Sequence, residues 1–389
     1  MYNFDLPVER RGTGSIKWDV GENELPMWVA DMDFKTAPQI TEIIESRAKH
    51  GVFGYTDVTD EWYDAYIGWW KKRHNFEIKK DWLIFCTGVV PAISSIVRKL
   101  TTPAEKVVLM TPVYNIFFNS ILNNGRNPLQ CELRYKNGSY HIDFEDLERK
   151  LADNQTSMLI LCNPQNPTGN IWDKETLIKI GEMCFKYGVT VISDEIHCDI
   201  TSPGKSYVPF ASVSEKALKN SITCIAPTKA FNIAGIQTAA VYVPDPVLRH
   251  KVRRGLNTDE VAEPNVFAVD AAVAAFTKGE DWLDELRNYI YSNKLYAYEY
   301  IKNEIPEIKA VISDATYLLW LGYDKNFGKS SDVAEIIRKK TGLYLCAGEQ
   351  YGKGGEYFLR MNIACPRSSL EDGLKRLKSG TEFLGEKSV

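Results

Sequence analysis

The sequence has no strong charge imbalance and no long apolar run. Its 389 residues contain 47 Lys and Arg against 51 Asp and Glu, a formal net charge of -4. This balance gives no electrostatic reason to expect binding to nucleic acid or to an anionic membrane. No stretch approaches the ~18 apolar residues of a membrane span, and the N-terminus, MYNFDLPVERRGTGSIKWDV, lacks the apolar centre of a signal peptide. We therefore expect a cytoplasmic protein.

Paired cysteines and nucleotide-binding loops are missing as well. The eight cysteines are scattered singly without a C-x-x-C pair, which is typical of reduced core thiols, so we expect neither disulfides nor a metal site. No G-x-x-x-x-G-K-[ST] loop exists, and GKGGEY lacks the strand and helix that a dinucleotide fingerprint needs. Four of the five histidines lie among polar residues and are expected at the surface: His50, His74, His141 and His250.

Residues from about 80 to 245 alternate short apolar runs with helical patterns. In the helix expected after Asp173, an N-cap candidate, apolar residues recur at spacings of three and four. The apolar runs are continuous, as in strands that helices cover on both faces, and this predicts a three-layer α/β/α domain around a mostly parallel sheet. The runs are WLIFCTG, KVVLMTP, SMLILCNP, VTVISDE, SITCIAP and QTAAVYVP.

The pattern of polar and apolar residues changes after about residue 285. A long polar helical pattern is followed there by strand-like ATYLLWLGY and YFLRMNIA. We predict a large domain of residues 49–285, and a smaller α+β domain formed by residues 286–389 together with the N-terminal residues 1–48.

Polar residues and glycines follow the apolar runs. Ligands of open α/β sheets bind beyond the carboxyl ends of the strands, so these residues are site candidates, although each alone has an ordinary explanation as a turn or helix cap. One lysine, in APTKAFNIAGIQ, lies among small and apolar neighbours, where burial would lower its pKa and favour imine formation. The candidates are Gly88, Val89, Val90, Tyr114, Asn166, Asp194, His197, Thr228 and Lys229.

Taken together, these candidates supply what a pyridoxal 5'-phosphate (PLP) enzyme needs. Lys229 would bind the cofactor aldehyde and later move a proton, while Asp194 would keep the pyridine nitrogen protonated. Asn166 would hydrogen-bond the ring oxygen, and Tyr114 would stack on the ring. The turn TGVVPA opens a helix whose N–H groups suit a phosphate, and Thr228 would add a hydroxyl.

These segments resemble a known family. NPQNPTG, ISDEIH and APTKAFNIAG closely resemble the active-site segments of fold-type I PLP enzymes, the class I/II aminotransferase superfamily. MWVADMDF, GVVPAI, SDEIH and MNIACPR are similar to segments of the MalY/PatB branch of cystathionine β-lyases, also called C–S lyases. The resemblance runs from about residue 4 to residue 380 and implies the PLP-transferase fold.

The resemblance also implies roles for single residues. Lys229 resembles the Schiff-base lysine, and Arg360, in FLRMNIACPR, resembles the arginine whose planar fork clamps the substrate carboxylate beside Asn166. Val29 and Ala30 resemble the segment that closes over the substrate. Tyr55, in FGYT, resembles a tyrosine lent to the neighbouring subunit's phosphate site, which implies a homodimer with shared active sites.

Three positions depart from the aminotransferase pattern. Ala226 and Gln237 occupy the places where many aminotransferases carry a serine and an arginine for the phosphate. His197 stands where a tyrosine usually reaches the ring oxygen; it is either a feature of the lyase branch or a satisfied core histidine.

The leading functional hypothesis is PLP-dependent β-elimination on sulfur amino acids such as cystathionine, cysteine or S-alkyl cysteines, with pyruvate, ammonia and a thiol as products. Transamination is the alternative, because it needs the same catalytic groups. A PLP-fold regulator that binds a partner protein is a third reading, which the intact set of catalytic residues disfavours.

Overall fold

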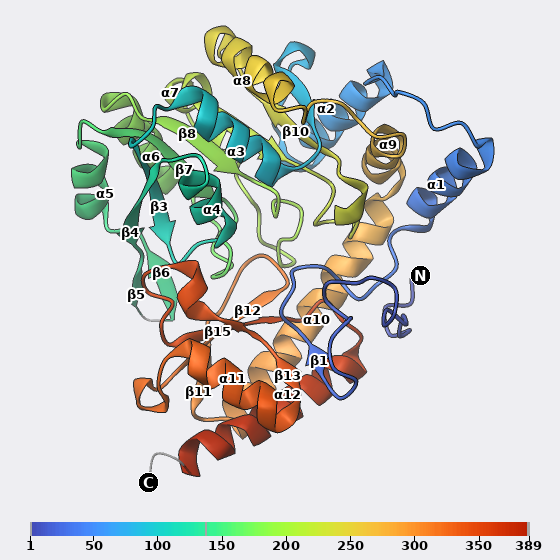
Figure 1. Ribbon diagram of the computed structural model, residues 1–389, viewed down its shortest axis with the longest axis vertical. Coiled ribbons are helices and arrows are strands. Elements are labelled where there is room, and N and C mark those ends of the chain that lie inside the picture. Colours follow the sequence, from blue (N-terminus) through green and yellow to red (C-terminus); the bar gives the residue numbers. More distant parts are fainter. Residues whose placement is uncertain (1, 137, 387–389) are drawn as a thin grey trace.

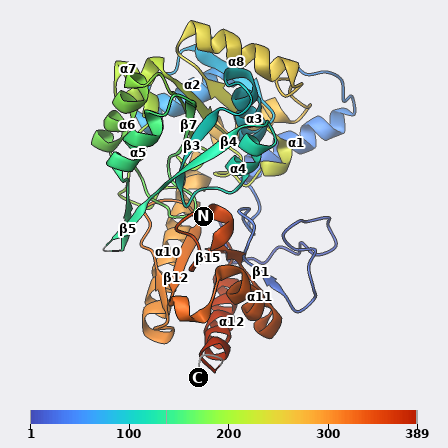
Figure 2. The same cartoon turned by 60° about the vertical axis from the view of Figure 1, so that its left-hand side comes forward.

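The computed structural model describes residues 2–136 and 138–386. Figures 1 and 2 show a larger α/β body and a smaller part below it, with the N-terminal segment beside the smaller part. No helix within the described ranges is long and apolar enough to cross a membrane. All eight cysteines are buried and free, which confirms the prediction of core thiols without disulfides.

The large body is built on a seven-stranded sheet in the order β2-β10-β9-β8-β7-β3-β4. Neighbouring strands run parallel except β10, which is antiparallel to both β2 and β9. The predicted mostly parallel sheet is therefore confirmed. The strands are β2 (Leu83–Cys86), β3 (Lys106–Thr111), β4 (Asn127–Glu132), β7 (Thr156–Cys162), β8 (Thr190–Asp194), β9 (Ser221–Ile225) and β10 (Ala239–Tyr242).

Helices cover both faces of this sheet. Within β3, Val107 and Leu109 belong to one hydrophobic cluster and Val108 and Met110 to another, so both faces of the strand are buried, as its unbroken apolar run requires. The covering helices are α1 (Pro38–His50), α2 (Asp60–His74), α3 (Val89–Leu100), α4 (Ile116–Leu122), α5 (Phe144–Leu151), α6 (Lys174–Lys186), α7 (Glu215–Lys219), α8 (Pro246–Thr258) and α9 (Ala268–Lys278). Asp173 caps α6 as predicted, because its side chain accepts a hydrogen bond from the Thr176 N–H (2.7 Å).

The smaller part contains a four-stranded sheet in the order β11-β12-β15-β14. The N-terminal segment joins it, since β1 (Leu25–Pro26) pairs in parallel with β13 (Leu343–Tyr344). Its other elements are β11 (Ile308–Ala310), β12 (Leu318–Tyr323), β14 (Cys346–Ala347), β15 (Phe358–Asn362), α11 (Ser330–Thr341) and α12 (Arg367–Glu386). A hairpin of β5 (Arg134–Lys136) and β6 (Ser139–His141) extends from the large body.

Helix α10 (Glu280–Glu304) runs continuously from the large body into the smaller part (Figure 1). The predicted boundary at residues 285 and 286 falls inside it, and the boundary at residues 48 and 49 falls inside α1. The division into residues 49–285 and residues 1–48 with 286–389 stays a prediction.

The strand register brings the candidate residues to one edge of the large sheet. Cys162, at the end of β7, lies opposite Asp194, and Asp194 lies opposite Cys224 in β9. The loops that follow these three strands therefore start at the same level.

Candidate active site

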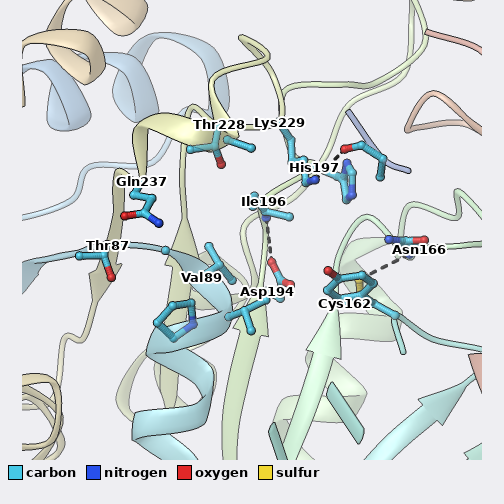
Figure 3. Close-up of a pocket in the computed structure, with 16 residues that line it drawn as sticks. Thr87, Val89, Cys162, Asn166, Asp194, Ile196, His197, Thr228, Lys229 and Gln237 are labelled. Carbon is cyan, nitrogen blue, oxygen red and sulfur yellow. Dashed lines mark hydrogen bonds between the residues drawn. The ribbon is translucent and has the colours of Figure 1, made fainter. Parts of the chain in front are cut away.

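A cavity of about 270 Å³ opens at this carboxyl edge (Figure 3). Thr87, Val89 and Gln237 lie on one side of it, and Asn166, Cys162 and His197 lie on the other. Most of the predicted site residues line the cavity, namely Ala30, Gly88, Val89, Val90, Tyr114, Asn166, Asp194, His197, Thr228 and Lys229. Residues that sequence reasoning did not select also line it: Thr87, Pro91, Cys162, Ile196, Ala234 and Gln237.

Lys229 reaches into the cavity from the turn that follows β9. Its Nζ donates a hydrogen bond to the main-chain oxygen of Ala30 (2.7 Å). Burial, reinforced by the positive charge of Arg360, lowers the pKa of the Lys229 amine to about 8. At pH 7 about a tenth of this amine is therefore uncharged, far more than for an ordinary lysine, and the uncharged form is the one that reacts with an aldehyde or accepts a proton.

Asp194 ends β8 at the floor of the cavity. The Ile196 N–H donates to its Oδ1 (3.1 Å). Burial nevertheless raises the pKa of this carboxyl group to about 7, and the hydrogen bond and Lys229 oppose the rise only in part. A carboxylate that is costly to ionise by itself suits a cationic partner in the cavity, such as a protonated pyridine nitrogen.

The N-terminus of α3 supplies an anion site opposite Lys229. Gly88, the N-cap residue, makes no side-chain hydrogen bond to the helix, so the first N–H groups of α3, at Val89 and Val90, have no helical acceptor. These groups and the positive end of the helix dipole favour a phosphate. Thr228 lines the same cavity, as predicted for a phosphate-binding hydroxyl.

Gln237 lines the cavity, which was not expected from the sequence. The sequence marked this position only as the place of a missing arginine, but the Gln237 side chain lies at the cavity wall on the same side as Thr87 and Val89 (Figure 3). Its backbone is in the left-handed region (φ 57°) directly after a short 3-10 turn. An uncharged amide donor thus occupies the space next to the anion site.

His197 is buried and electrically neutral. Burial, together with the charges of Lys229 and Arg360, lowers its pKa to about 3. Its Nδ1 has no hydrogen-bond partner in the described part of the chain, and its ring lies edge-on to Tyr317 at 6.0 Å between centroids. An orphaned buried nitrogen at the cavity wall leaves a hydrogen-bonding position for a bound group, and the choice between the two readings of His197 stays a prediction.

Asn166 is held by the loop NPQNPTG. The Asn166 N–H donates to Cys162 Sγ (3.4 Å), and the loop approaches residues 313–315 so closely that a Cβ on Gly169 would lie 2.3 Å from the Ser313 Cβ. Glycine is therefore required there, also because φ is +73°. Tyr114 also lines the cavity; it is largely buried and meets Phe117 edge-on at 5.6 Å.

Arg360 lies in β15, just outside the cavity wall. Its Nη1 donates to Asn166 Oδ1 (3.2 Å) and its Nη2 to the main-chain oxygen of Trp28 (2.8 Å). Within residues 2–136 and 138–386 it forms no ion pair, and its Nε has no partner. A buried guanidinium without a carboxylate is costly, so a substrate carboxylate beside Asn166 would complete it.

Two predicted residues do not line the cavity. Val29 is absent from the cavity lining, and its main-chain oxygen accepts a hydrogen bond from Asn362 Nδ2 (2.6 Å). Tyr55 is fully exposed and lies between α1 and α2, in a segment that runs along the outer edge of the large body (Figure 1). A role for Tyr55 in its own chain's cavity does not fit this position.

A second polar cluster was missed from the sequence. His74, predicted at the surface, instead has its side chain largely buried, and its Nε2 lies 3.0 Å from Asp199 Oδ1. Together with Cys198 these residues could in principle hold a metal ion. Asp199 already accepts from Trp69 Nε1 (3.1 Å) and lies 3.9 Å from Arg73, so we interpret the cluster as a polar network that anchors α2.

Comparisons with known proteins establish the family of the chain. The profile of the family "Aminotransferase class I and II" matches residues 15–377. The chain belongs to this family. It is 44% identical to cystathionine β-lyase PatB of Bacillus subtilis over 383 residues, which cover 97% of this chain and 99% of PatB.

Two solved structures show the same fold with the cofactor. Cystalysin of Treponema denticola, which contains pyridoxal 5'-phosphate, superposes with a TM-score of 0.95 at 33% identity and covers 99% of this chain and 100% of its own. The PLP-bound C–S lyase of Staphylococcus hominis has a TM-score of 0.91 at 33% identity, over 97% and 98% of the two chains. The predicted PLP-transferase fold and family are confirmed.

Proposed function

We propose that the chain is a PLP-dependent C–S lyase of the cystathionine β-lyase type. It would cleave sulfur amino acids such as cystathionine, cysteine or S-alkyl cysteines to pyruvate, ammonia and a thiol. The observation that carries this proposal is the 44% identity to PatB over nearly the whole of both chains, combined with a cavity in which Lys229 and Asp194 both have shifted pKa values.

The cavity fits PLP by the chemistry of its donors. Lys229 would bind the aldehyde carbon, Asp194 the pyridine nitrogen and Asn166 the ring oxygen, while Tyr114 would cover a ring face. The phosphate would lie at the α3 N-terminus, with hydrogen bonds from the residues Gly88, Val89, Val90, Thr228 and Gln237. When bound, PLP supplies an electron sink for negative charge at the substrate Cα.

Residues of the chain would orient the substrate and transfer the proton. Arg360 would orient the substrate by its α-carboxylate, a bidentate contact that also fixes the direction of the Cα–H bond. The Lys229 amine, with a pKa near 8, would then take the Cα proton, and departure of the thiolate from Cβ would follow. His197 stays neutral, so it adds no positive charge that would compete with the pyridine nitrogen for Asp194.

A product assay separates this proposal from transamination. The enzyme would be incubated with cystathionine or S-methylcysteine, first without and then with an added keto acid. Pyruvate and thiol formed without keto acid support the lyase, and turnover that strictly requires keto acid contradicts it. Background turnover with a filled cofactor site would instead favour a regulatory binding protein.

We also propose a cytoplasmic homodimer in which Tyr55 serves the partner's phosphate site. The support is its complete exposure on an extended segment that also displays Val52 and Phe53 (62% and 61% exposed).

Mixing two inactive variants, Lys229→Ala and Tyr55→Ala, tests the shared site. Shared sites would restore about a quarter of the full activity, because random exchange makes half of the dimers mixed and each has one intact site. No recovery after verified subunit exchange contradicts the proposal.

A further inference from the structure

Residues 28–34 cross the mouth of the cavity between β1 and α1, and we call this segment the strap. Two proposed catalytic side chains donate to its main chain: Arg360 Nη2 to the oxygen of Trp28 (2.8 Å) and Lys229 Nζ to the oxygen of Ala30 (2.7 Å). The Lys229 contact conflicts with the proposed reaction, because Lys229 must join the cofactor, and Arg360 must share its donors between Trp28 and the substrate carboxylate. The strap therefore needs other anchors while the enzyme works.

Asn362 provides one anchor from the smaller part. It lies in β15, two residues after Arg360, and is 1% exposed. Its Nδ2 donates to the main-chain oxygens of both Val29 and Asp31 (2.6 Å each). Its Oδ1 accepts from the Ala364 N–H (2.8 Å), which fixes the orientation of the amide.

Asn232 provides the other anchor from the large body. It lies three residues after Lys229 in the left-handed region (φ 54°), a conformation that asparagine tolerates better than most residues. Its Oδ1 accepts from the Met32 N–H (2.9 Å), and its Nδ2 donates to the oxygens of Met32 (3.0 Å) and Phe34 (2.8 Å). The Asn232 amide thus binds the main chain at both Met32 and Phe34, in the second half of the strap.

We propose that Asn362 and Asn232 are positioning residues that hold the strap closed, one from each part of the molecule, when the cofactor takes Lys229 away from it and the substrate shares the donors of Arg360. A neutral amide suits this task because it both donates and accepts, and because its contacts do not depend on the changing charges in the cavity. The Ala30 oxygen then keeps the Tyr317 hydroxyl as a donor (3.0 Å). The inference rests on the proposed roles of Lys229 and Arg360.

The chain contains a matched control for the test. Asn293 is completely buried, its Nδ2 bridges the main-chain oxygens of Ile363 (3.1 Å) and Cys365 (2.9 Å), and its Oδ1 accepts from Arg367 Nε (2.9 Å). It makes the same type of two-carbonyl contact as Asn362 but does not touch the strap. Asn293→Asp therefore shows how much stability is lost when a carboxylate is placed against two main-chain oxygens away from the strap.

Hydrogen exchange of the PLP-loaded chain, in which Lys229 would have left the Ala30 oxygen, tests the anchors without reference to turnover. In Asn362→Asp and Asn232→Asp we expect peptides that cover the strap to exchange about 10-fold faster or more than in the unmodified chain, since each variant loses two amide donors. Asn293→Asp should leave strap exchange unchanged. Unchanged strap exchange in both anchor variants, or equal acceleration in the control, overturns the proposal.

Steady-state kinetics with the PLP-loaded enzyme provide the second measurement. The neutral pair Asn362→Ser and Asn293→Ser avoids any added charge and guards against misfolding of the Asp variants. We expect Asn362→Ser to raise KM about 10-fold with kcat changed far less, because a loosened strap no longer closes over the substrate, whereas Asn293→Ser keeps KM. Equal KM values in the two variants contradict the proposal. If lyase activity is absent in every form but the exchange pattern holds, the proposed function fails and the anchoring stands.

Discussion

The two halves of the candidate site are built in different ways. The half that fits the cofactor is made by segments that directly follow β2, β3, β7, β8 and β9, so its residues lie together because parallel strands end at one edge. The half that fits the substrate depends on contacts between distant segments, such as Arg360 with Trp28 and Asn362 with Val29. The first half is a property of the sheet, and the second depends on how the smaller part and the strap dock onto it.

Removing the central group of the cofactor half should have the largest effect. Lys229→Ala is expected to lower turnover on the order of 10⁴-fold or more, because the amine has both the cofactor-binding and the proton-transfer task. Pyruvate release measures this loss, and borohydride reduction followed by peptide mapping should label Lys229 in the unmodified enzyme. Labelling of another lysine would contradict the assignment.

Arg360→Lys tests the substrate half by itself. The ammonium group keeps the charge but cannot reproduce the bidentate fork, so KM for the amino acid should rise about 100-fold. The cofactor absorption spectrum without substrate should stay unchanged, which separates the two halves. A loss of PLP with an unchanged KM would show that they are not separable.

Asp194→Asn should alter the pH dependence of the cofactor-free chain. Burial raises the pKa of Asp194 from 3.8 to about 7, so between these values the folded chain holds a proton that the unfolded chain has lost. The free energy of unfolding therefore falls as pH rises through this range, and the fall is complete above pH 7. At pH 7.5 the variant should be more stable by roughly 1–3 kcal/mol, while its PLP affinity drops.

Urea unfolding of the cofactor-free chain at pH 5 and pH 7.5 measures this effect. Burial also raises the pKa of the neighbouring Glu195 to about 7, so part of the pH dependence should remain in the variant. An identical pH dependence in both forms would show that the Asp194 carboxyl group is not destabilised by burial.

Gln237→Arg should have the smallest effect, and in the favourable direction. The left-handed backbone conformation at position 237 disfavours glutamine and arginine to a similar extent. The change therefore mainly adds a positive charge beside the α3 N-terminus. PLP should be released about 3–10-fold more slowly, because a charge-assisted hydrogen bond to phosphate replaces a neutral one. Spectroscopic titration of PLP loss at graded phosphate concentrations checks this, and faster release would place the phosphate elsewhere.

Sequence reasoning succeeded where local pattern and tertiary environment agree. The continuous apolar runs became the buried strands β2, β3, β7, β8, β9 and β10. It missed β4, NPLQCE, because an edge strand is partly exposed and need not be apolar, as its burial shows. It also treated His74 as a surface residue, since nothing nearby in the sequence indicates that Asp199 lies against it.

The sequence by itself determined the fold class, the family and the residues of the cofactor half, because strand ends are visible in a one-dimensional pattern and the motifs at those ends are specific. Only the tertiary structure decided that Gln237 lines the cavity, that Arg360 is buried with no carboxylate partner among the described residues, and that Asn232 and Asn362 bind the strap from the two parts of the molecule. These properties arise from contacts between residues up to about 330 positions apart, and neither periodicity nor spacing records which distant segments meet.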